Sequence, residues 1–135
     1  MIRGLGHAAL RVGDMEKSVD FYTRVLGGEI AMQGEENGRI TMTYVRLTDL
    51  SYIELFAAPK DAVKGDPGIG VAHLCVAVDD AQAEAERVAL LGLPKPQICV
   101  GKYSNYHFWL KDPDGNDIEM MQYLPGYPQP TAREG

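Results

Sequence analysis

The sequence has few cysteines, no long apolar run and no excess of basic residues. Its 135 residues include two cysteines, Cys75 and Cys99, which are too few for a disulfide framework, so we expect reduced thiols. No apolar run approaches the ~18 residues that a membrane span requires. Lysine and arginine number 13 against 19 aspartates and glutamates, for a formal net charge of −6. Without a basic stripe to offset phosphate repulsion, we expect no binding to nucleic acid.

The opening residues, MIRGLGHAALRV, lack the apolar core and cleavage site of a signal peptide, so we expect a cytoplasmic protein. With 45% hydrophobic and 24% charged residues, the composition is that of a soluble globular protein. The length suits one domain, 1–135.

Within that length the chain contains two copies of one unit. The copies span about 5–57 and 71–123, followed by a tail rich in proline and polar residues at 124–135, which we expect to be extended or frayed.

Each copy has the pattern of one strand, one helix and three further strands. The alternating apolar runs predict opening strands at about 5–12 and 71–78. Asp14 and the pair Asp79–Asp80 are predicted to cap the amphipathic helices that follow, and Gly27 and Gly92 to end them. The closing strands are predicted at 29–33, 39–47 and 51–57 in the first copy and at 97–101, 106–111 and 117–123 in the second. Two tandem βαβββ modules of the α+β class are therefore expected.

A histidine opens each module and a glutamate lies in its last strand. Because strand side chains alternate, His7 lies opposite the apolar residues of its strand, and Glu54 lies opposite Ile53 and Leu55. The same test places His73 and Glu119 on the equivalent face of the second module. The more apolar face should pack under the helix, so all four side chains are expected on the face without helices.

These four side chains predict a metal site. A lone histidine near a strand end is more often a surface or core residue than a ligand, and a lone strand glutamate usually faces solvent. Their recurrence in register favours a metal, because two nearby carboxylates between apolar neighbours need a cation between them. Two imidazoles and two carboxylates suit a divalent transition metal with open positions for water or substrate.

Other side chains are candidates for a pocket wall. Tyr52 and Phe56 share the parity of Glu54 and are the better aromatic candidates, with Trp109 as a further one. The third histidine, His107, has Met42 as its counterpart in the first module and either lines the pocket or is structural. The remaining aromatic candidates, more often core than wall, are Tyr44, Tyr103 and Tyr106.

The paired modules with these histidine and glutamate positions resemble the vicinal oxygen chelate superfamily, which includes glyoxalase I, methylmalonyl-CoA epimerase, extradiol dioxygenases and fosfomycin resistance proteins. LRVGDMEKSVDFYTRVLG at 10–27 is similar to the opening segment of glyoxalase I, and WLKDPDGNDIEMM at 109–121 resembles its closing segment. The resemblance implies a cupped mixed sheet with the helices on its outer face.

The ligand pattern most resembles that of glyoxalase I, whose order of His, Glu, His and Glu here falls on His7, Glu54, His73 and Glu119. Epimerases carry glutamine at the position of the first carboxylate, and dioxygenases and fosfomycin proteins use two histidines and one glutamate.

The resemblance implies a metal-dependent lyase or isomerase acting by enediolate chemistry on a substrate with vicinal oxygens, such as the hemithioacetal of a 2-oxoaldehyde. By the same resemblance Glu119 is the base and Glu54 acts on the other face. The compact length resembles the Ni²⁺- or Co²⁺-activated glyoxalases, with Zn²⁺, Mn²⁺ and Fe²⁺ as alternatives.

The residues that contact glutathione match the family only in part. Arg11 matches an arginine that contacts glutathione in glyoxalase I. The family's next two contacts, an asparagine and an arginine, are replaced by Ala58 and Ile69. The resemblance therefore carries over the metal chemistry but not two of the glutathione contacts.

Two other kinds of function stay open. One is another metal-dependent reaction on the same fold, such as epimerisation or extradiol-type dioxygenation, and the other is a non-catalytic ligand-binding or resistance protein. In each case the partner is a small molecule. The superfamily also implies a homodimer, with the site either within one chain or shared between subunits.

Overall fold

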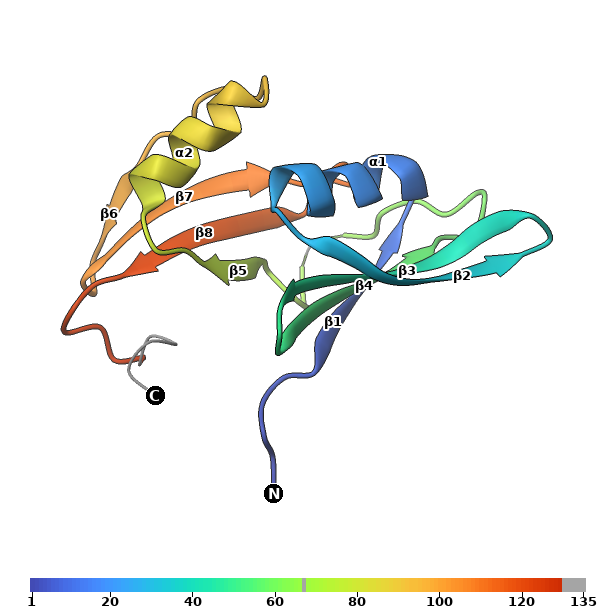
Figure 1. Ribbon diagram of the computed structural model, residues 1–135, viewed down its shortest axis with the longest axis horizontal. Helices are drawn as coiled ribbons and strands as arrows, with labels where there is room; N and C mark the ends of the chain where they lie inside the picture. The colour runs from blue at the N-terminus through green and yellow to red at the C-terminus, as the bar shows by residue number, and fades with distance from the viewer. Residues whose placement is uncertain (67, 130–135) are drawn as a thin grey trace. The chain divides into compact units, whose positions relative to one another are not determined.

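The computed structural model describes residues 1–66 and 68–129, and the chain divides into two compact units, Met1–Asp66 (unit 1) and Pro67–Gly135 (unit 2). Each unit holds one four-stranded mixed sheet with a helix across one of its faces (Figure 1). The predicted α+β class with two βαβββ modules is confirmed. No helix among the described residues is both long and apolar enough to span a membrane.

Unit 1 has the strand order β1-β4-β3-β2. β1 runs parallel to β4, while β3 is antiparallel to both β4 and β2. The parallel pairing requires the chain to cross over between the first and last strands, and the helical segment and the β2–β3 hairpin fill that connection. The elements are β1 (His7–Val12), α1 (Met15–Asp20), the π-helical turn η1 (Phe21–Val25), β2 (Glu29–Glu36), β3 (Arg39–Thr48) and β4 (Ser51–Ala57).

Unit 2 repeats this topology with the strand order β5-β8-β7-β6. Here β5 runs parallel to β8, and β7 is antiparallel to β8 and β6. The turn between β7 and β8 is organised by Asp112, whose carboxylate accepts hydrogen bonds from the backbone of Asp114 and Asn116 at 3.0 and 2.8 Å. The elements are β5 (Leu74–Ala77), α2 (Ala81–Leu90), β6 (Cys99–Gly101), β7 (Asn105–Lys111) and β8 (Asp117–Tyr123).

The helix ends follow the predicted signals. The Asp14 carboxylate accepts a hydrogen bond from the backbone of Lys17, and Asp80 accepts one from Ala83. Gly27 and Gly92 follow the helices with φ of 81° and 93°, a left-handed conformation that favours glycine.

The first helix differs from the prediction in its last turn, which is π-helical. The Thr23 hydroxyl donates to the Val19 carbonyl at 2.6 Å and competes there with the backbone ladder. The Leu26 amide then donates to the carbonyl of Phe21, five residues earlier, at 3.0 Å. An apolar 3.6-residue pattern does not reveal this competition.

The helix-facing side of each sheet forms the core. α1 packs on β3 and β4, and α2 packs on β7 and β8. Buried and accessible residues alternate along β1 and β4. His7 and Glu54 are at accessible positions of this alternation and so lie on the face of the sheet away from the helix. The core side chains include Val12, Tyr22, Val25, Val45, Leu55, Ala85, Val88, Phe108, Leu110, Ile118 and Met120.

Several strand limits differ from the sequence prediction. β2 extends to Glu36, because Glu35 and Glu36 pair with β3, and the turn is formed by Asn37 and Gly38 rather than by the whole of GEENG. β5 begins at Leu74, so the second histidine precedes the strand instead of lying in it. Of the tail, 124–129 is held to unit 2, with the Leu124 amide donating to the carbonyl of Ser104 at 3.0 Å. Residues 130–135 lie outside the described part.

Candidate metal centre

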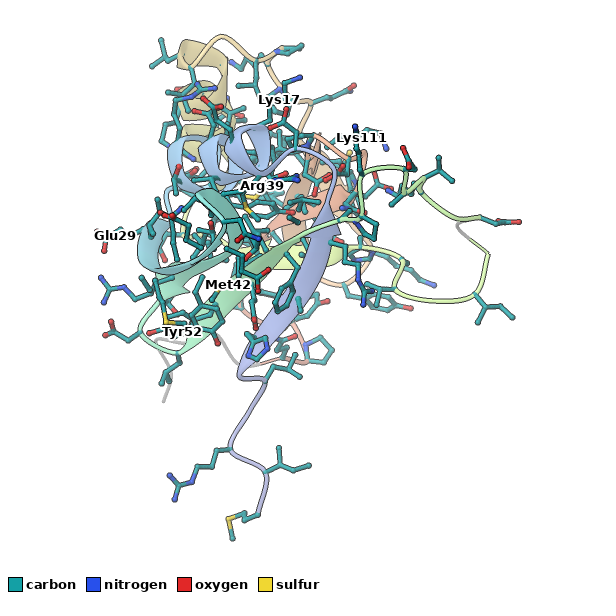
Figure 2. The ribbon with its side chains drawn as sticks, turned by 90° about the vertical axis from the view of Figure 1, so that its right-hand side faces the viewer. Lys17, Glu29, Arg39, Met42, Tyr52 and Lys111 are labelled. Carbon is teal, nitrogen blue, oxygen red and sulfur yellow. The ribbon has the colours of Figure 1, made fainter. Side chains whose placement is uncertain are left out.

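The histidine and glutamate of unit 1 meet on the face of the sheet away from α1. In the β1–β4 pairing, His7 lies opposite Tyr52 and Ala9 lies opposite Glu54, so His7 and Glu54 are diagonal neighbours on one face. The His7 Nε2 is 3.0 Å from the Glu54 Oε2. Figure 2 shows the same division of the sheet, with Lys17 on the side of the helix and Tyr52 on the other side.

Unit 2 brings its own pair together in the same way. Cys75 lies opposite Glu119 in the β5–β8 pairing, and His73 stands two residues before Cys75. The His73 Nε2 is 3.1 Å from the Glu119 Oε2. The two pairs therefore have the same atoms and nearly the same separation, and in both the histidine stands two residues before the residue that lies opposite the glutamate.

Both carboxylates are largely withdrawn from solvent while their histidines stay accessible. The side chains of Glu54 and Glu119 are 18% and 9% exposed, against 43% and 38% for His7 and His73. A withdrawn carboxylate needs a compensating partner, and in each unit the imidazole forms an ion pair with it. Each pair thus presents one ring nitrogen and one carboxylate oxygen at the accessible side of the sheet.

The geometry of each pair fits two adjacent ligands of one metal ion. Metal–nitrogen and metal–oxygen bonds of about 2.1 Å at a right angle place their donor atoms about 3.0 Å apart. The measured separations of 3.0 and 3.1 Å match this value, which is also that of a hydrogen bond between the same atoms. Among the described residues, no group of three or more His, Cys, Asp or Glu side chains is close enough to hold a metal ion. Each unit by itself therefore brings together two candidate ligands.

In unit 1 a tyrosine orients the histidine, a role that we did not predict. The Tyr44 hydroxyl lies 3.0 Å from the His7 Nδ1, the ring nitrogen that faces away from Glu54. Tyr44 stacks on Tyr52, with ring centroids 5.1 Å apart and 17° between the planes. Pairing the predicted strands 39–47 and 51–57 around their turn would have placed Tyr44 opposite Glu54, where the structure has it.

In unit 2 a tryptophan takes the equivalent place. Trp109 lies opposite Glu119 and meets the His73 ring edge-on, with centroids 4.9 Å apart. His107, on the same strand and face, lies opposite Met121. In unit 1 Met42 lies opposite Phe56, so the predicted correspondence of Met42 with His107 is confirmed.

The other predicted pocket residues divide between the two faces. Arg11 lies opposite Phe56, and both are exposed on the face that carries Glu54. Tyr106 lies opposite Gln122, on the face away from Glu119, and Tyr103 lies in the turn before β7. The structure therefore groups Arg11, Tyr52, Phe56, His107 and Trp109 with their module's His–Glu pair and leaves two of the six aromatic candidates apart.

The two cysteines are free thiols, as predicted. Cys75 shares the face of Glu119, and its Sγ lies 3.8 Å from the Tyr123 hydroxyl. Burial raises the pKa of the Cys75 thiol, and the nearby Glu119 carboxylate acts in the same direction. Burial likewise raises the pKa of the Tyr123 hydroxyl. A protonated thiol is a poor nucleophile, so Cys75 is not a candidate for covalent catalysis.

This chain is similar in sequence and in fold to proteins named lactoylglutathione lyase. Lactoylglutathione lyase of Neisseria meningitidis serogroup A is 34% identical over 126 residues, covering 89% of this chain and 91% of that protein. The crystal structure of lactoylglutathione lyase from Agrobacterium tumefaciens has a TM-score of 0.68 at 20% identity, covering 90% of this chain and 94% of that one.

An antibiotic-binding protein from Streptomyces, TnmS3, has a TM-score of 0.64 at 21% identity, covering 90% of this chain and 97% of that one. Both structural likenesses show the fold alone. A family model, described as Glyoxalase/Bleomycin resistance protein/Dioxygenase superfamily, matches residues 4–120. On this match, together with the duplicated βαβββ modules, the chain belongs to the glyoxalase/bleomycin resistance protein/dioxygenase superfamily.

Proposed function

We propose that this chain is a metal-dependent lyase or isomerase of the glyoxalase I type, with a divalent metal ion held by His7, Glu54, His73 and Glu119. The observation that carries the proposal is the repetition of one pair. Two units of different sequence place an imidazole nitrogen and a carboxylate oxygen 3.0 and 3.1 Å apart, with the same two-residue offset in the pairing of the first and last strands. The relatives named lactoylglutathione lyase, at about a third identity over most of their length, support the type of reaction.

The proposal requires the two pairs to meet at one metal ion, either within a chain or between the subunits of a homodimer. A complementation experiment separates these arrangements. One variant carries His7→Ala and Glu54→Ala, and the other carries His73→Ala and Glu119→Ala. If subunits share the site, co-refolding the two inactive variants restores activity through an intact site in the mixed dimer. If the site lies within one chain, the mixture stays inactive.

A bound divalent metal would polarise two neighbouring oxygens of the substrate and stabilise the negative charge that develops there. The chain's own contribution is a base on each side of the reacting carbons. Glu119 takes the proton from the carbon beside the carbonyl, and the proton is then delivered to the neighbouring carbon. With a side chain 9% exposed, Glu119 is shielded from solvent protons during this transfer. Glu54 acts as the base on the opposite face of the reacting carbons.

The substrate that we propose is the hemithioacetal of a 2-oxoaldehyde or an analogue. Its apolar part is received by aromatic side chains of the accessible face, Tyr52, Phe56 and Trp109. The Arg11 side chain is exposed and has no hydrogen-bond or ion-pair partner among the described residues, so its guanidinium group is available to an anionic group. We do not assign glutathione as the thiol, because Ala58 and Ile69 replace two side chains expected to contact it.

The test is a screen of metals against substrates. Metal-free protein is reconstituted with Ni²⁺, Co²⁺, Zn²⁺, Mn²⁺ or Fe²⁺, and each form is assayed for thioester formation from methylglyoxal adducts of glutathione and of other thiols. We expect activity with Ni²⁺ or Co²⁺. Oxygen consumption with Fe²⁺ would instead identify a dioxygenase. A protein that takes up none of the metals would be a non-catalytic ligand-binding protein.

A further inference from the structure

Unit 2 carries a histidine outside the His–Glu pair, on the same face of the sheet. His107 and Trp109 alternate along β7 with the buried Phe108 and Leu110, which lie on the other face. The Trp109 ring makes edge-on contacts with two imidazoles, with centroid distances of 4.9 Å to His73 and 6.2 Å to His107. His107 therefore lies one aromatic ring beyond the His73–Glu119 pair.

The His107 ring is held by a buried amide. The His107 Nδ1 lies 3.0 Å from the Asn105 Oδ1, and Asn105 is 5% exposed. Gly101 lies opposite Asn105 in the β6–β7 pairing. A Cβ at position 101 would collide with the Asn105 amide, so the absence of a side chain there gives the amide its space. Gly101 and Asn105 together support a single ring nitrogen of His107.

That support determines which nitrogen of His107 carries the proton. An amide oxygen only accepts hydrogen bonds, so the Nδ1 facing it must be the N–H of the neutral ring. The lone pair then lies on Nε2. Within residues 1–66 and 68–129, no hydrogen-bond partner is found for this Nε2. A half-buried acceptor with its other ring nitrogen fixed is suited to receive a donor from a ligand.

We propose that His107 is a specificity-determining residue, whose Nε2 accepts a hydrogen bond from a hydroxyl or ammonium group on the thiol part of the substrate. This inference rests on the proposed function for the nature of the reaction. It adds the class of thiol: one that carries a hydrogen-bond donor a few atoms from sulfur. The donor would stand on the far side of Trp109 from the reacting carbons, which lie at the His73–Glu119 pair.

The first test measures the tautomer and needs no turnover. Long-range ¹H–¹⁵N spectra of the Zn²⁺-loaded protein report which nitrogen of His107 is protonated. We expect the Nδ1–H form in the parent protein and a mixture in Gly101→Ala, in which the new methyl group displaces the Asn105 amide. Asn105→Ala provides the same comparison if Gly101→Ala does not fold. An Nε2–H form in the parent protein overturns the proposal without reference to any variant.

The second test compares three methylglyoxal adducts, formed with 2-mercaptoethanol, 2-(dimethylamino)ethanethiol and propanethiol. They present a hydroxyl, an ammonium and a methyl group at the same distance from sulfur. We expect kcat/KM about fivefold higher for one or both donor-bearing adducts than for the propanethiol adduct, the worth of about one hydrogen bond. The adduct that gains more identifies the donor as hydroxyl or ammonium.

The matched variants are His107→Leu, which removes the acceptor, and His107→Gln, whose amide oxygen replaces it. The preference should vanish in His107→Leu and persist in His107→Gln, with metal affinity unchanged in both. Equal preference in the parent protein and His107→Leu overturns the proposal, and so does loss of metal from His107→Leu.

If no adduct is turned over, the proposed function fails. The His107 inference is then decided by the Nε2 resonance, which should shift on adding the 2-mercaptoethanol adduct and not the propanethiol adduct.

Discussion

In unit 1 the histidine of the pair is held by a hydrogen bond, whereas in unit 2 its counterpart is held by an aromatic contact. The Tyr44 hydroxyl lies 3.0 Å from the His7 Nδ1. His73 instead meets the edge of the Trp109 ring at 4.9 Å. A hydroxyl both donates and accepts, so it can partner either tautomer of His7, while an indole N–H only donates. The two units thus share the ligand pair and differ in how that pair is supported.

The carboxylates differ in a related way. Glu119 is half as exposed as Glu54, at 9% against 18% for the side chains. Glu119 lies opposite Cys75 and Trp109, whereas Glu54 lies opposite Ala9 and Tyr44. One duplicated unit thus places the same pair of side chains twice, in different surroundings, and we propose that the two copies divide the chemistry between them.

The largest effect is expected from removing the unit 2 carboxylate. Glu119→Gln should lower kcat by about 10³-fold, because the amide cannot accept the substrate proton. Glu54→Gln is the matched control and should lower kcat by a smaller factor. Steady-state kinetics at equal metal content, checked by elemental analysis, measure both. Equal losses in the two variants would remove the proposed division of roles.

Metal affinity is expected to depend on one histidine from each unit. His7→Ala and His73→Ala should each weaken metal binding by more than about 100-fold, because losing a residue that only orients a ligand already costs about 10- to 100-fold. Isothermal titration calorimetry with the chelator-stripped protein gives the affinities. His107→Ala, which lacks the third histidine, should bind as the parent protein does. A His73→Ala variant with full affinity would limit the metal site to unit 1.

The units also differ after their helices, where unit 1 has Gly28 and unit 2 has Leu93. A Cβ on Gly28 would lie 2.6 Å from the Val45 Cγ1 and 2.7 Å from the Tyr22 carbonyl oxygen. Gly28→Ala should therefore lower the free energy of unfolding by about 1–3 kcal/mol. Gly34→Ala, whose Cβ would stand 3.6 Å from Met42, is the control and should change it by no more than about 0.5 kcal/mol. Urea denaturation measures both, and similar values would show that β3 yields to the added methyl group.

The smallest effect tests the supports of the two histidines directly. Tyr44→Phe removes the hydroxyl and keeps the ring, so metal affinity should fall about tenfold. Trp109→Phe keeps an aromatic edge against His73 and should leave metal affinity nearly unchanged. Titration calorimetry on the two variants gives the comparison. A larger loss in Trp109→Phe than in Tyr44→Phe would reverse our account of which unit depends on a hydrogen bond.

The sequence predicted the modules and the face of the ligands well, because both follow from local rules. Strand alternation placed Glu54 opposite Ile53 and Leu55, and the burial of β4 agrees. The caps Asp14 and Asp80 are short-range signals that the structure confirms. The roles of the predicted site residues stay predictions.

Features that depend on pairing or on competition between hydrogen bonds were not predicted. The contact of Tyr44 with His7 joins β3 to β1 across β4, and its position follows from two strand registers at once. The space that Gly101 leaves for Asn105 depends on the β6–β7 register. The π-helical turn depends on one threonine hydroxyl. None of these has a signature in composition or periodicity.

The sequence by itself determined the duplicated βαβββ pattern and the face on which His7, Glu54, His73 and Glu119 lie, because alternation along a strand fixes the side of the sheet. Only the tertiary structure decided that each histidine lies within 3.1 Å of its glutamate, and which side chain supports each ring. Those contacts join residues distant in the chain, and register between strands, not the order of residues within one, brings them together.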